Sequence, residues 1–430
     1  MQEKKFYITS VFKLYESLEN KITWYHLVAF MILLPFDRFY TQLVLLSLLL
    51  HVVIHLDRSR LRSLFTFKNL VLSSVLLVGL AGVIYTPDIN QAWQDLQRQS
   101  AILLFPIIFS CFRLNIGQYR TSILTFFGFT CVAVVLYLYA DAIRIILYHK
   151  LPLNALFSQA FLNHNFSEPL DLHATYLSMY AALSVAVFSY FFLKEKRNRY
   201  RLVYTVAISI LLAGLVQLAS RSVLLATVIF IVVGFPLLLF TGIQRLKFIL
   251  VAIVVLAVAL IGIIKIDSFK KRYVSELKND LTQASINNEI LEPRILRWKH
   301  ALRLIKEAPV IGYGSGSERR LLKEKYFKAR LYNSYLNEFN AHNQYLSIAL
   351  KTGIAGLIIF LLTLLYGFIL AWANRNIVFM AFMIIISIVS FSENILDVNK
   401  GIFFYAFFFS FFGWSSKPFD FLHRLKAGNS

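Results

Sequence analysis

Three short polar segments carry the side chains best suited to chemistry. They are Ser220-Arg221-Ser222, Arg294-Ile-Leu-Arg297-Trp298 and Asn340-Ala341-His342-Asn343-Gln344. A guanidinium group presents a fork of N–H donors that matches phosphate oxygens, and a neutral imidazole accepts a proton from a hydroxyl group. Together the segments predict a site that binds a phosphorylated donor and activates a hydroxyl acceptor.

Ser220 and Arg221 stand where two apolar stretches meet. We expect Ser220 to cap the helix that follows and Arg221 to lie in its first turn, where free N–H groups and the helix dipole favour an anion. The alternative is an arginine that only reaches from the membrane interface towards water.

Arg294 and Trp298 are four residues apart and share one face of a predicted helix, and Arg297 is a nearby second candidate. The helix leads into a glycine-rich segment, Pro309-Val-Ile-Gly312-Tyr-Gly314-Ser-Gly316. Gly312 and Gly314 would allow a sharp turn and a close backbone approach to a bound substrate. The segment lacks the lysine of a phosphate-binding P-loop, so the alternative is an amphipathic helix that ends in an ordinary turn.

His342 stands at the start of the next apolar stretch. With Asn340 as the predicted N-cap, His342 lies in the first helical turn, where the dipole disfavours its protonated form. The imidazole would then accept a proton at neutral pH. Asn343 and Gln344 add groups that can bind sugar hydroxyls. The alternative is a histidine at the membrane interface without a chemical role.

The composition indicates that these segments belong to a membrane protein. Hydrophobic residues make up 58% of the 430 residues and charged residues only 16%, against about 25% in soluble domains. A net charge of +21 would favour a nucleic-acid partner in a soluble protein, but here the basic residues flank the apolar stretches. We therefore expect an all-α fold among membrane lipids, with no nucleic-acid partner. Cys111 and Cys131 indicate neither a disulfide framework nor a metal site.

The apolar stretches predict about twelve transmembrane helices. They cover residues 24–36, 40–56, 69–85, 100–112, 121–143, 172–193, 202–219, 222–241, 248–264, 342–371, 376–391 and 401–415. Lys and Arg residues are about three times as frequent in one set of alternate connections as in the short connections of the other set. The positive-inside rule then predicts a multi-pass protein of the bacterial inner membrane with both termini in the cytoplasm.

One connection is much longer than the others and is predicted to lie outside. Residues 266–341 contain fifteen Lys or Arg and nine Asp or Glu residues. Since loops of this length usually fold and carry function, we predict a transmembrane region over 1–265, a periplasmic loop domain over 266–341, and a second transmembrane region with a cytoplasmic tail over 342–430. Around the smaller outer loop, 144–171, we expect His164, His173 and Asp171 to have a structural or interfacial role.

A transporter of lipid-linked sugars is the alternative outside enzymes. Many transporters are built from repeated halves and carry ionisable residues in the middle of their spans. The sequence contains no evident internal repeat, and its ionisable residues gather near the predicted outer ends of the spans. These features favour an enzyme over a flippase or exporter.

The order of the motifs resembles the O-antigen ligase family, which includes O-antigen polymerases and protein O-oligosaccharyltransferases. The resemblance rests on Ser-Arg at a span start, Arg-x-x-x-Trp, Gly-Tyr-Gly-Ser-Gly, and Ala-His-Asn-Gln-Tyr-Leu running into Lys351-Thr-Gly353-Ile-Ala-Gly356-Leu. It is most specific between about residues 200 and 400.

The resemblance implies a GT-C-like membrane glycosyltransferase that moves a glycan from undecaprenyl pyrophosphate to an acceptor hydroxyl. For a ligase, the acceptor is the lipid A–core oligosaccharide. The family's catalytic residues match His342, Arg221 and Arg294, and Glu393 has a position similar to an acidic residue of relatives. Neither metal nor cofactor is implied.

Two related activities stay open at this stage. A polymerase extends the glycan on its carrier lipid, and a protein oligosaccharyltransferase uses a protein acceptor. Polymerases tend to have two large basic outer loops, whereas one loop dominates here, which favours the ligase.

Overall fold

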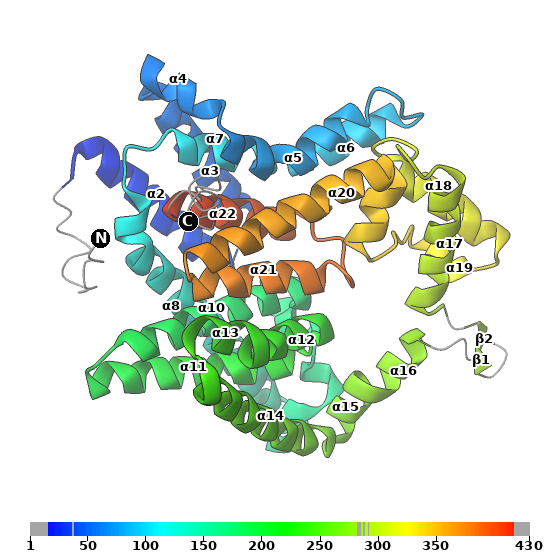
Figure 1. Cartoon of the computed structure of the whole chain (residues 1–430). Helices are drawn as coiled ribbons and strands as arrows, with labels where there is room; N and C mark the ends of the chain where they lie inside the picture. The colour runs from blue at the N-terminus through cyan, green and yellow to red at the C-terminus, as the bar shows by residue number, and fades with distance from the viewer. Residues whose placement is uncertain (1–15, 37, 282–284, 287–288, 291, 417–430) are drawn as a thin grey trace.

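The computed structural model describes residues 16–36, 38–281, 285–286, 289–290 and 292–416, and the described chain is almost entirely helical (Figure 1). The first half contains α2 (Leu18–Leu33), α3 (Arg38–Ile54), α4 (Arg58–Leu64), α5 (Phe67–Ala81), α6 (Ile89–Gln99), α7 (Ala101–Ser110), α8 (Ile116–Tyr148), η1 (Leu153–Phe157), η2 (Gln159–Phe161), α9 (His164–Ser167), η3 (Glu168–Leu170), α10 (Ala174–Lys194) and α11 (Asn198–Leu218).

The second half is also helical, apart from one short pair of strands. It contains α12 (Arg221–Ile229), the π-helical η4 (Phe230–Gly234), α13 (Phe235–Leu239), α14 (Gly242–Ile264), α15 (Asp267–Lys270), η5 (Lys271–Ser275), α16 (Glu276–Leu281), β1 (Ser285–Ile286), β2 (Glu289–Ile290), α17 (Arg294–Glu307), α18 (Ser317–Lys328), α19 (Tyr332–Leu336), α20 (Gln344–Ala373), α21 (Ile377–Val389) and α22 (Asn399–Ser415). The antiparallel pair of β1 and β2 is the only sheet among the described residues.

Helices occupy every apolar stretch that the sequence predicts, because a helix satisfies its own backbone hydrogen bonds where water is absent. Among the described residues, six helices are long and apolar enough to cross a membrane, and a seventh is added if α4 and α5, bent by 57°, form one span. The protein is therefore a multi-pass membrane protein. The count of about twelve spans and the orientation remain predictions. The predicted cytoplasmic tails fall partly in residues 1–15 and 417–430, outside the described residues.

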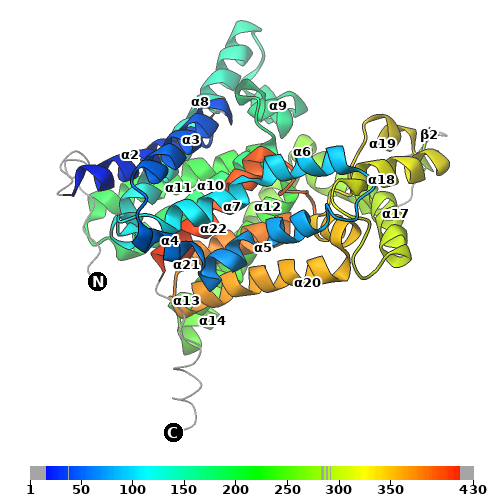
Figure 2. The ribbon, with the colours of Figure 1, turned by 90° about the horizontal axis from the view of Figure 1, so that it is seen from above.

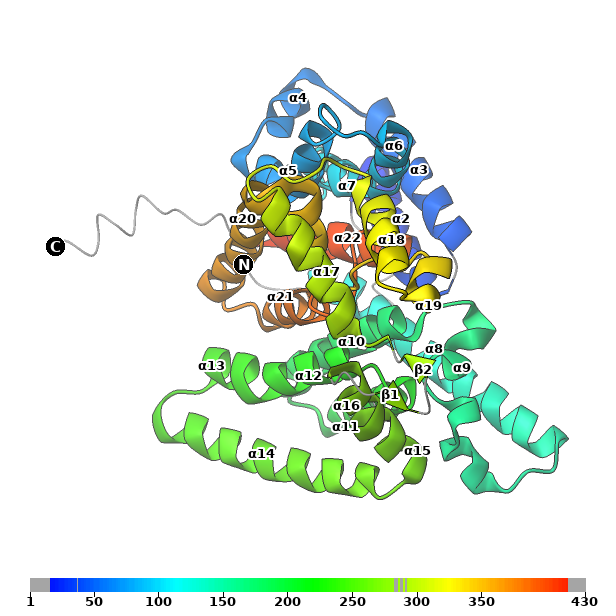
Figure 3. The same ribbon diagram turned by 90° about the vertical axis from the view of Figure 1, so that its right-hand side faces the viewer.

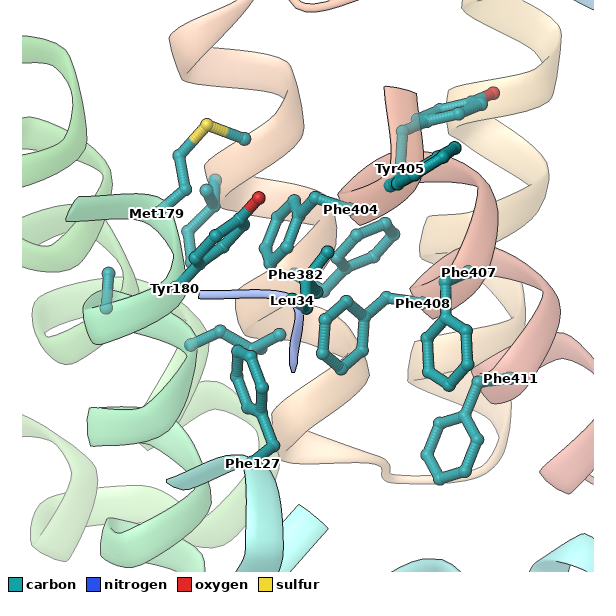
Figure 4. Close-up of a cluster of buried hydrophobic side chains, with 14 of the residues drawn as sticks. Leu34, Phe127, Met179, Tyr180, Phe382, Phe404, Tyr405, Phe407, Phe408 and Phe411 are labelled. Atoms are coloured by element: carbon teal, nitrogen blue, oxygen red, sulfur yellow. The ribbon is translucent and has the colours of Figure 1, made fainter. Parts of the chain in front are cut away.

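The short apolar helices α7, α21 and α22 lie inside the bundle. α22 is buried along nearly its whole length, as expected for a helix that is apolar on all sides. Figure 4 shows its aromatic side chains meeting those of α21, α10 and α8, with Phe382 and Phe404 at 5.5 Å and Phe127 and Phe408 at 4.9 Å between ring centroids. This core fixes α10, α21 and α22 against one another.

α14 lies at the opposite extreme, at the edge of the molecule (Figure 3). None of the 18 most apolar consecutive residues of α14 is buried inside the protein, whereas 78% of the corresponding residues of α10 are buried. Figure 2 shows that the far end of α8, with α9, also projects from the main body.

The loop between α14 and α20 is folded where it is described. Its helices α17 and α18 share a small hydrophobic core with the start of α20, formed by Ala301, Leu304, Leu322, Tyr326, Leu331, Ala341 and Leu350. The predicted division into three units is not tested by this packing. The core does attach α17 and α18 to the end of α20 from which the His342 loop emerges.

The glycine-rich segment docks onto a break in α20. Gly353 interrupts the helix with φ 66° and ψ −169°, and the N–H groups of Tyr313 and Gly314 donate to the carbonyls of Leu350 and Lys351. The segment also reaches the turn after α5, because Ser315 N–H donates to the carbonyl of Gly82.

Candidate functional site

His342 lies in a loop immediately before α20. The N-cap is Asn343, whose Oδ1 accepts the N–H groups of Tyr345 at 3.0 Å and Leu346 at 3.1 Å. The prediction that Asn340 caps the helix and that His342 lies in its first turn is therefore wrong. Asn343 can satisfy two free N–H groups, so the helix begins later, and His342 instead has a left-handed backbone with φ 46°.

Glu393, in the connection between α21 and α22, brings the site together. Its Oε2 lies 3.4 Å from Nδ1 of His342, and its Oε1 lies 3.6 Å from Nη2 of Arg294. The Glu393 side chain is only 11% exposed. Burial alone would raise the pKa of this carboxyl, but the hydrogen bond with His342 and the charge of Arg294 lower the pKa below its ordinary value. Glu393 is therefore ionised at neutral pH.

Arg294 is the first residue of α17, and its side chain is 28% exposed. Besides the contact with Glu393, its Nη1 donates to the carbonyl of Ser392 at 2.7 Å. The structure thus brings the predicted residues Arg294, His342 and Glu393 into one cluster.

Arg297 and Trp298 support this cluster from the next turn of α17. The buried guanidinium of Arg297 lies over the ring of Phe339 at 5.0 Å, and that ring contacts the ring of His342 at 5.7 Å. Nε1 of Trp298 donates to the carbonyl of Ala341 at 3.0 Å. Their observed contacts are with the His342 loop, so a role in substrate binding remains a prediction.

Arg221 is the first residue of α12, as predicted, and Ser220 is its N-cap residue. Ser220 makes no side-chain hydrogen bond to the helix, however. Its Oγ donates to Oγ1 of Thr175 at 3.4 Å, which joins the start of α12 to the start of α10. Arg221 therefore lies beside the end of α10 that also carries His173.

His173 is a residue of this neighbourhood that sequence reasoning placed outside the site. It is the N-cap of α10, where Nδ1 accepts the N–H of Thr175 at 3.3 Å, and its ring lies 4.1 Å from that of His164. It is close enough to Glu393, His342 and Arg294 for their charges to act on it. The predicted structural role is observed in the cap.

Four other residues predicted to bind substrate make structural contacts in the protein. Asn343 and Gln344 are buried, and Gln344 Oε1 accepts the N–H of Leu396 at 2.8 Å. Gly312 and Gly314 have positive φ, and an added Cβ would lie 2.5 Å from the carbonyl oxygen of Leu350 or 2.6 Å from Cα of Thr86. The glycines permit close approach to the protein's own backbone, so we leave all four out of the proposed site.

A buried ion network behind the cluster was not predicted. Nζ of Lys351 lies 3.2 Å from Glu318 and 3.1 Å from Asp397, and Asn394 donates to Asp397 at 3.0 Å. A partly open pocket of about 40 Å³ lies beside this network; Asp95 and Lys351 are among its lining residues, and none of the three cluster residues lines it. In the sequence, Glu318 looks like any other acidic residue of a charged loop.

Comparison with known proteins supports one family. Residues 206–361 match a family model described as O-antigen ligase. The chain is also 31% identical over 190 residues to an uncharacterized protein of Haemophilus influenzae, a match that covers 41% of this chain and 47% of the relative. The chain thus spans about half the length of this curated relative. The family match begins before Arg221 and ends after His342, so it includes three of the predicted motifs.

Proposed function

We propose that this chain, whose residues 206–361 match the O-antigen ligase family model, transfers a glycan from undecaprenyl pyrophosphate to the hydroxyl of a lipid A–core oligosaccharide. We place the reaction on the periplasmic face of the inner membrane. The observation that carries the proposal is the contact of Glu393 with both His342 and Arg294.

His342 is the general base in this proposal. A carboxylate only accepts hydrogen bonds, so the contact with Glu393 keeps the proton on Nδ1 and leaves the Nε2 lone pair available. Nε2 takes the proton of the acceptor hydroxyl as its oxygen attacks the anomeric carbon of the donor sugar. The negative charge of Glu393 then stabilises the imidazolium that forms.

Arg294 and Arg221 hold the leaving group. As the bond between the anomeric carbon and the pyrophosphate oxygen breaks, its electron pair passes to the pyrophosphate. Guanidinium groups from α17 and from the N-terminus of α12 would neutralise that charge, and the α12 dipole adds to the effect. The mechanism uses side chains of this protein alone and needs no metal.

The acceptor distinguishes a ligase from its relatives. One large basic loop, rather than two, supports the ligase, while a polymerase or a protein oligosaccharyltransferase would use the same donor chemistry. A flippase would not depend on the proton-accepting group of His342.

The test is complementation of a Gram-negative host that lacks its own ligase. Wild type is compared with His342→Ala at matched membrane levels, and His149→Ala, an exposed histidine at the end of α8, is the control. Glycan on lipid A–core in wild type and His149→Ala only is the expected result. Longer glycans that stay on the carrier lipid would indicate a polymerase, and equal activity in all three proteins would remove His342 from the mechanism.

A further inference from the structure

The loop that carries His342 is held by hydrogen bonds to three consecutive backbone N–H groups. The N–H of Ala341 donates to Oε1 of Glu318 at 3.0 Å, and the N–H of His342 donates to Oδ1 of Asn340 at 2.9 Å. The N–H of Asn343 donates to Oδ1 of Asn394 at 2.7 Å. Two of the three acceptors come from elements outside the loop.

His342 needs such support because of its backbone conformation. A φ of 46° lies in the left-handed region, which is unfavourable for a residue with a Cβ atom. A conformation of this kind persists where the surrounding contacts over-determine it. The hydrogen bonds on both sides of His342 supply those contacts.

Glu318 is the buried anchor of this arrangement. It lies in the first turn of α18 and is only 2% exposed. Its Oε2 accepts a hydrogen bond from Ser347 and faces Nζ of Lys351 at 3.2 Å, which compensates the buried charge. Its Oε1 is available to accept the hydrogen bond from the His342 loop.

The same oxygen also reaches the segment that carries Glu393. Nδ2 of Asn394 donates to Oε1 of Glu318 at 3.4 Å. Glu318 therefore contacts the residue before His342 and the residue after Glu393, although these two residues lie on segments far apart in the sequence. One carboxylate oxygen joins both sides of the proposed catalytic pair.

We propose that Glu318 is a positioning residue that sets the geometry between His342 and Glu393, acting through Ala341 and Asn394. This inference rests on the proposed function for its kinetic consequence. Glu318 itself would contact neither donor nor acceptor. Misplacement of a base by about 1 Å reduces the rate roughly 100-fold, so loss of Glu318 should lower kcat and leave KM for the donor nearly unchanged.

The first experiment measures kcat and KM for Glu318→Ala and Glu318→Gln in purified, detergent-solubilised protein. Glutamine keeps an oxygen that can accept from Ala341, so it should restore most of the activity lost in the alanine variant. Glu324→Ala, on an exposed position of the same helix, is the matched control.

In a His342→Ala background, Glu318→Ala should cause no further loss of activity, because the two residues act as one unit. An additional loss in that background, or full activity of Glu318→Ala, would overturn the inference.

A second readout does not require transferase activity. The rate of His342 modification by diethyl pyrocarbonate, measured by mass spectrometry with His149 as internal reference, should rise severalfold in Glu318→Ala and return towards wild type in Glu318→Gln. An unchanged rate in Glu318→Ala contradicts the inference even if wild type proves inactive, whereas an inactive wild type with the expected modification pattern contradicts only the proposed function. If Glu318→Ala does not accumulate, Asn394→Ala takes its place, with the same expected results.

Discussion

Nδ1 of His342 lies 3.4 Å from Oε2 of Glu393, although the loop before α20 and the connection after α21 supply these residues separately. In the proposed mechanism, this contact gives the two imidazole nitrogens different tasks. Nδ1 is oriented by the carboxylate, and Nε2 is left for the acceptor hydroxyl.

Glu393→Gln tests this assignment. The amide preserves the shape but removes the charge that stabilises the imidazolium, so we expect kcat to fall about 100-fold, the lower end of what a positioned base contributes. Steady-state transfer with purified donor measures the effect. The control is Glu338→Gln. Glu338 is exposed, pairs with Lys323 in the loop between α14 and α20, and should be replaceable without loss of activity. A fully active Glu393→Gln variant would rule out the role given to the carboxylate.

The lowered pKa of Glu393 also predicts a dependence of stability on pH. The ordinary pKa of this carboxyl is 4.5, and the folded state binds its proton less readily than the unfolded state. The contribution to stability is therefore present above about pH 4.5 and is lost as the pH falls through the lower folded-state pKa. The difference in Tm between wild type and Glu393→Gln should shrink as the pH is lowered through this range. A constant difference would contradict the ionic contact.

Arg294 should contribute to donor binding through the geometry of its guanidinium. Arg294→Ala is expected to weaken binding of a prenyl pyrophosphate, and Arg294→Lys should restore it only in part because an ammonium group lacks the planar fork. Binding of the lipid to detergent-solubilised protein is the measurement. The control is Arg303→Lys, at an exposed position of the same helix. If wild type and Arg294→Ala bind the lipid with equal affinity, Arg294 does not bind the pyrophosphate.

The sequence predicts the helices well because the lipid environment allows few choices. Each apolar stretch must satisfy its backbone internally, so the positions of α8, α10, α14 and α20 follow from hydropathy, although α8 and α14 extend beyond the predicted stretches 121–143 and 248–264. Hydropathy does not say which helices face lipid. α14 and α22 are both strongly apolar, yet one is at the edge and the other in the core.

Sequence reasoning from residue type selected three residues that the structure brings together, and their chemical roles stay predictions. Arg294, His342 and Glu393 do form one cluster, although nothing in their spacing shows that Glu393 contacts both partners. The local conformation was less predictable. Asn340 and Asn343 are equally good caps by type, but the helix is capped by Asn343, whose backbone N–H donates to Asn394, a residue distant in sequence.

Lys351 should be essential for stability. Lys351→Met would leave Glu318 and Asp397 without their cation in a buried setting, and loss of one partner of such a network costs about 3–5 kcal/mol. Thermal unfolding in detergent should show a large decrease in Tm. Lys325→Met removes a more exposed contact with Glu307 and should cost at most about 1 kcal/mol. Similar Tm values for the two variants would argue against the buried network.

The break in α20 can be tested with a pair of glycines. At Gly353, φ is 66° and an added Cβ would lie 2.1 Å from the carbonyl oxygen of Val310, so Gly353→Ala should cost about 1–3 kcal/mol in strain alone. At Gly262 in α14, an added Cβ has no neighbour within 4 Å, and Gly262→Ala should be neutral or stabilise the helix by up to about 1 kcal/mol. Thermal unfolding of both variants makes the comparison, and a tolerated Gly353→Ala would contradict the docking of the glycine-rich segment.

The connection between α21 and α22 has a consequence for the nascent chain. Arg221 and Arg294 leave the ribosome well before Glu393 and Asn394. A translation product that stops before this connection therefore has the arginines proposed to hold the carrier lipid, but it lacks the carboxylate and the amide that orient His342. Such a product also lacks α22, whose aromatic side chains hold α10 and α21 together, so a late truncation should abolish the site as completely as an early one.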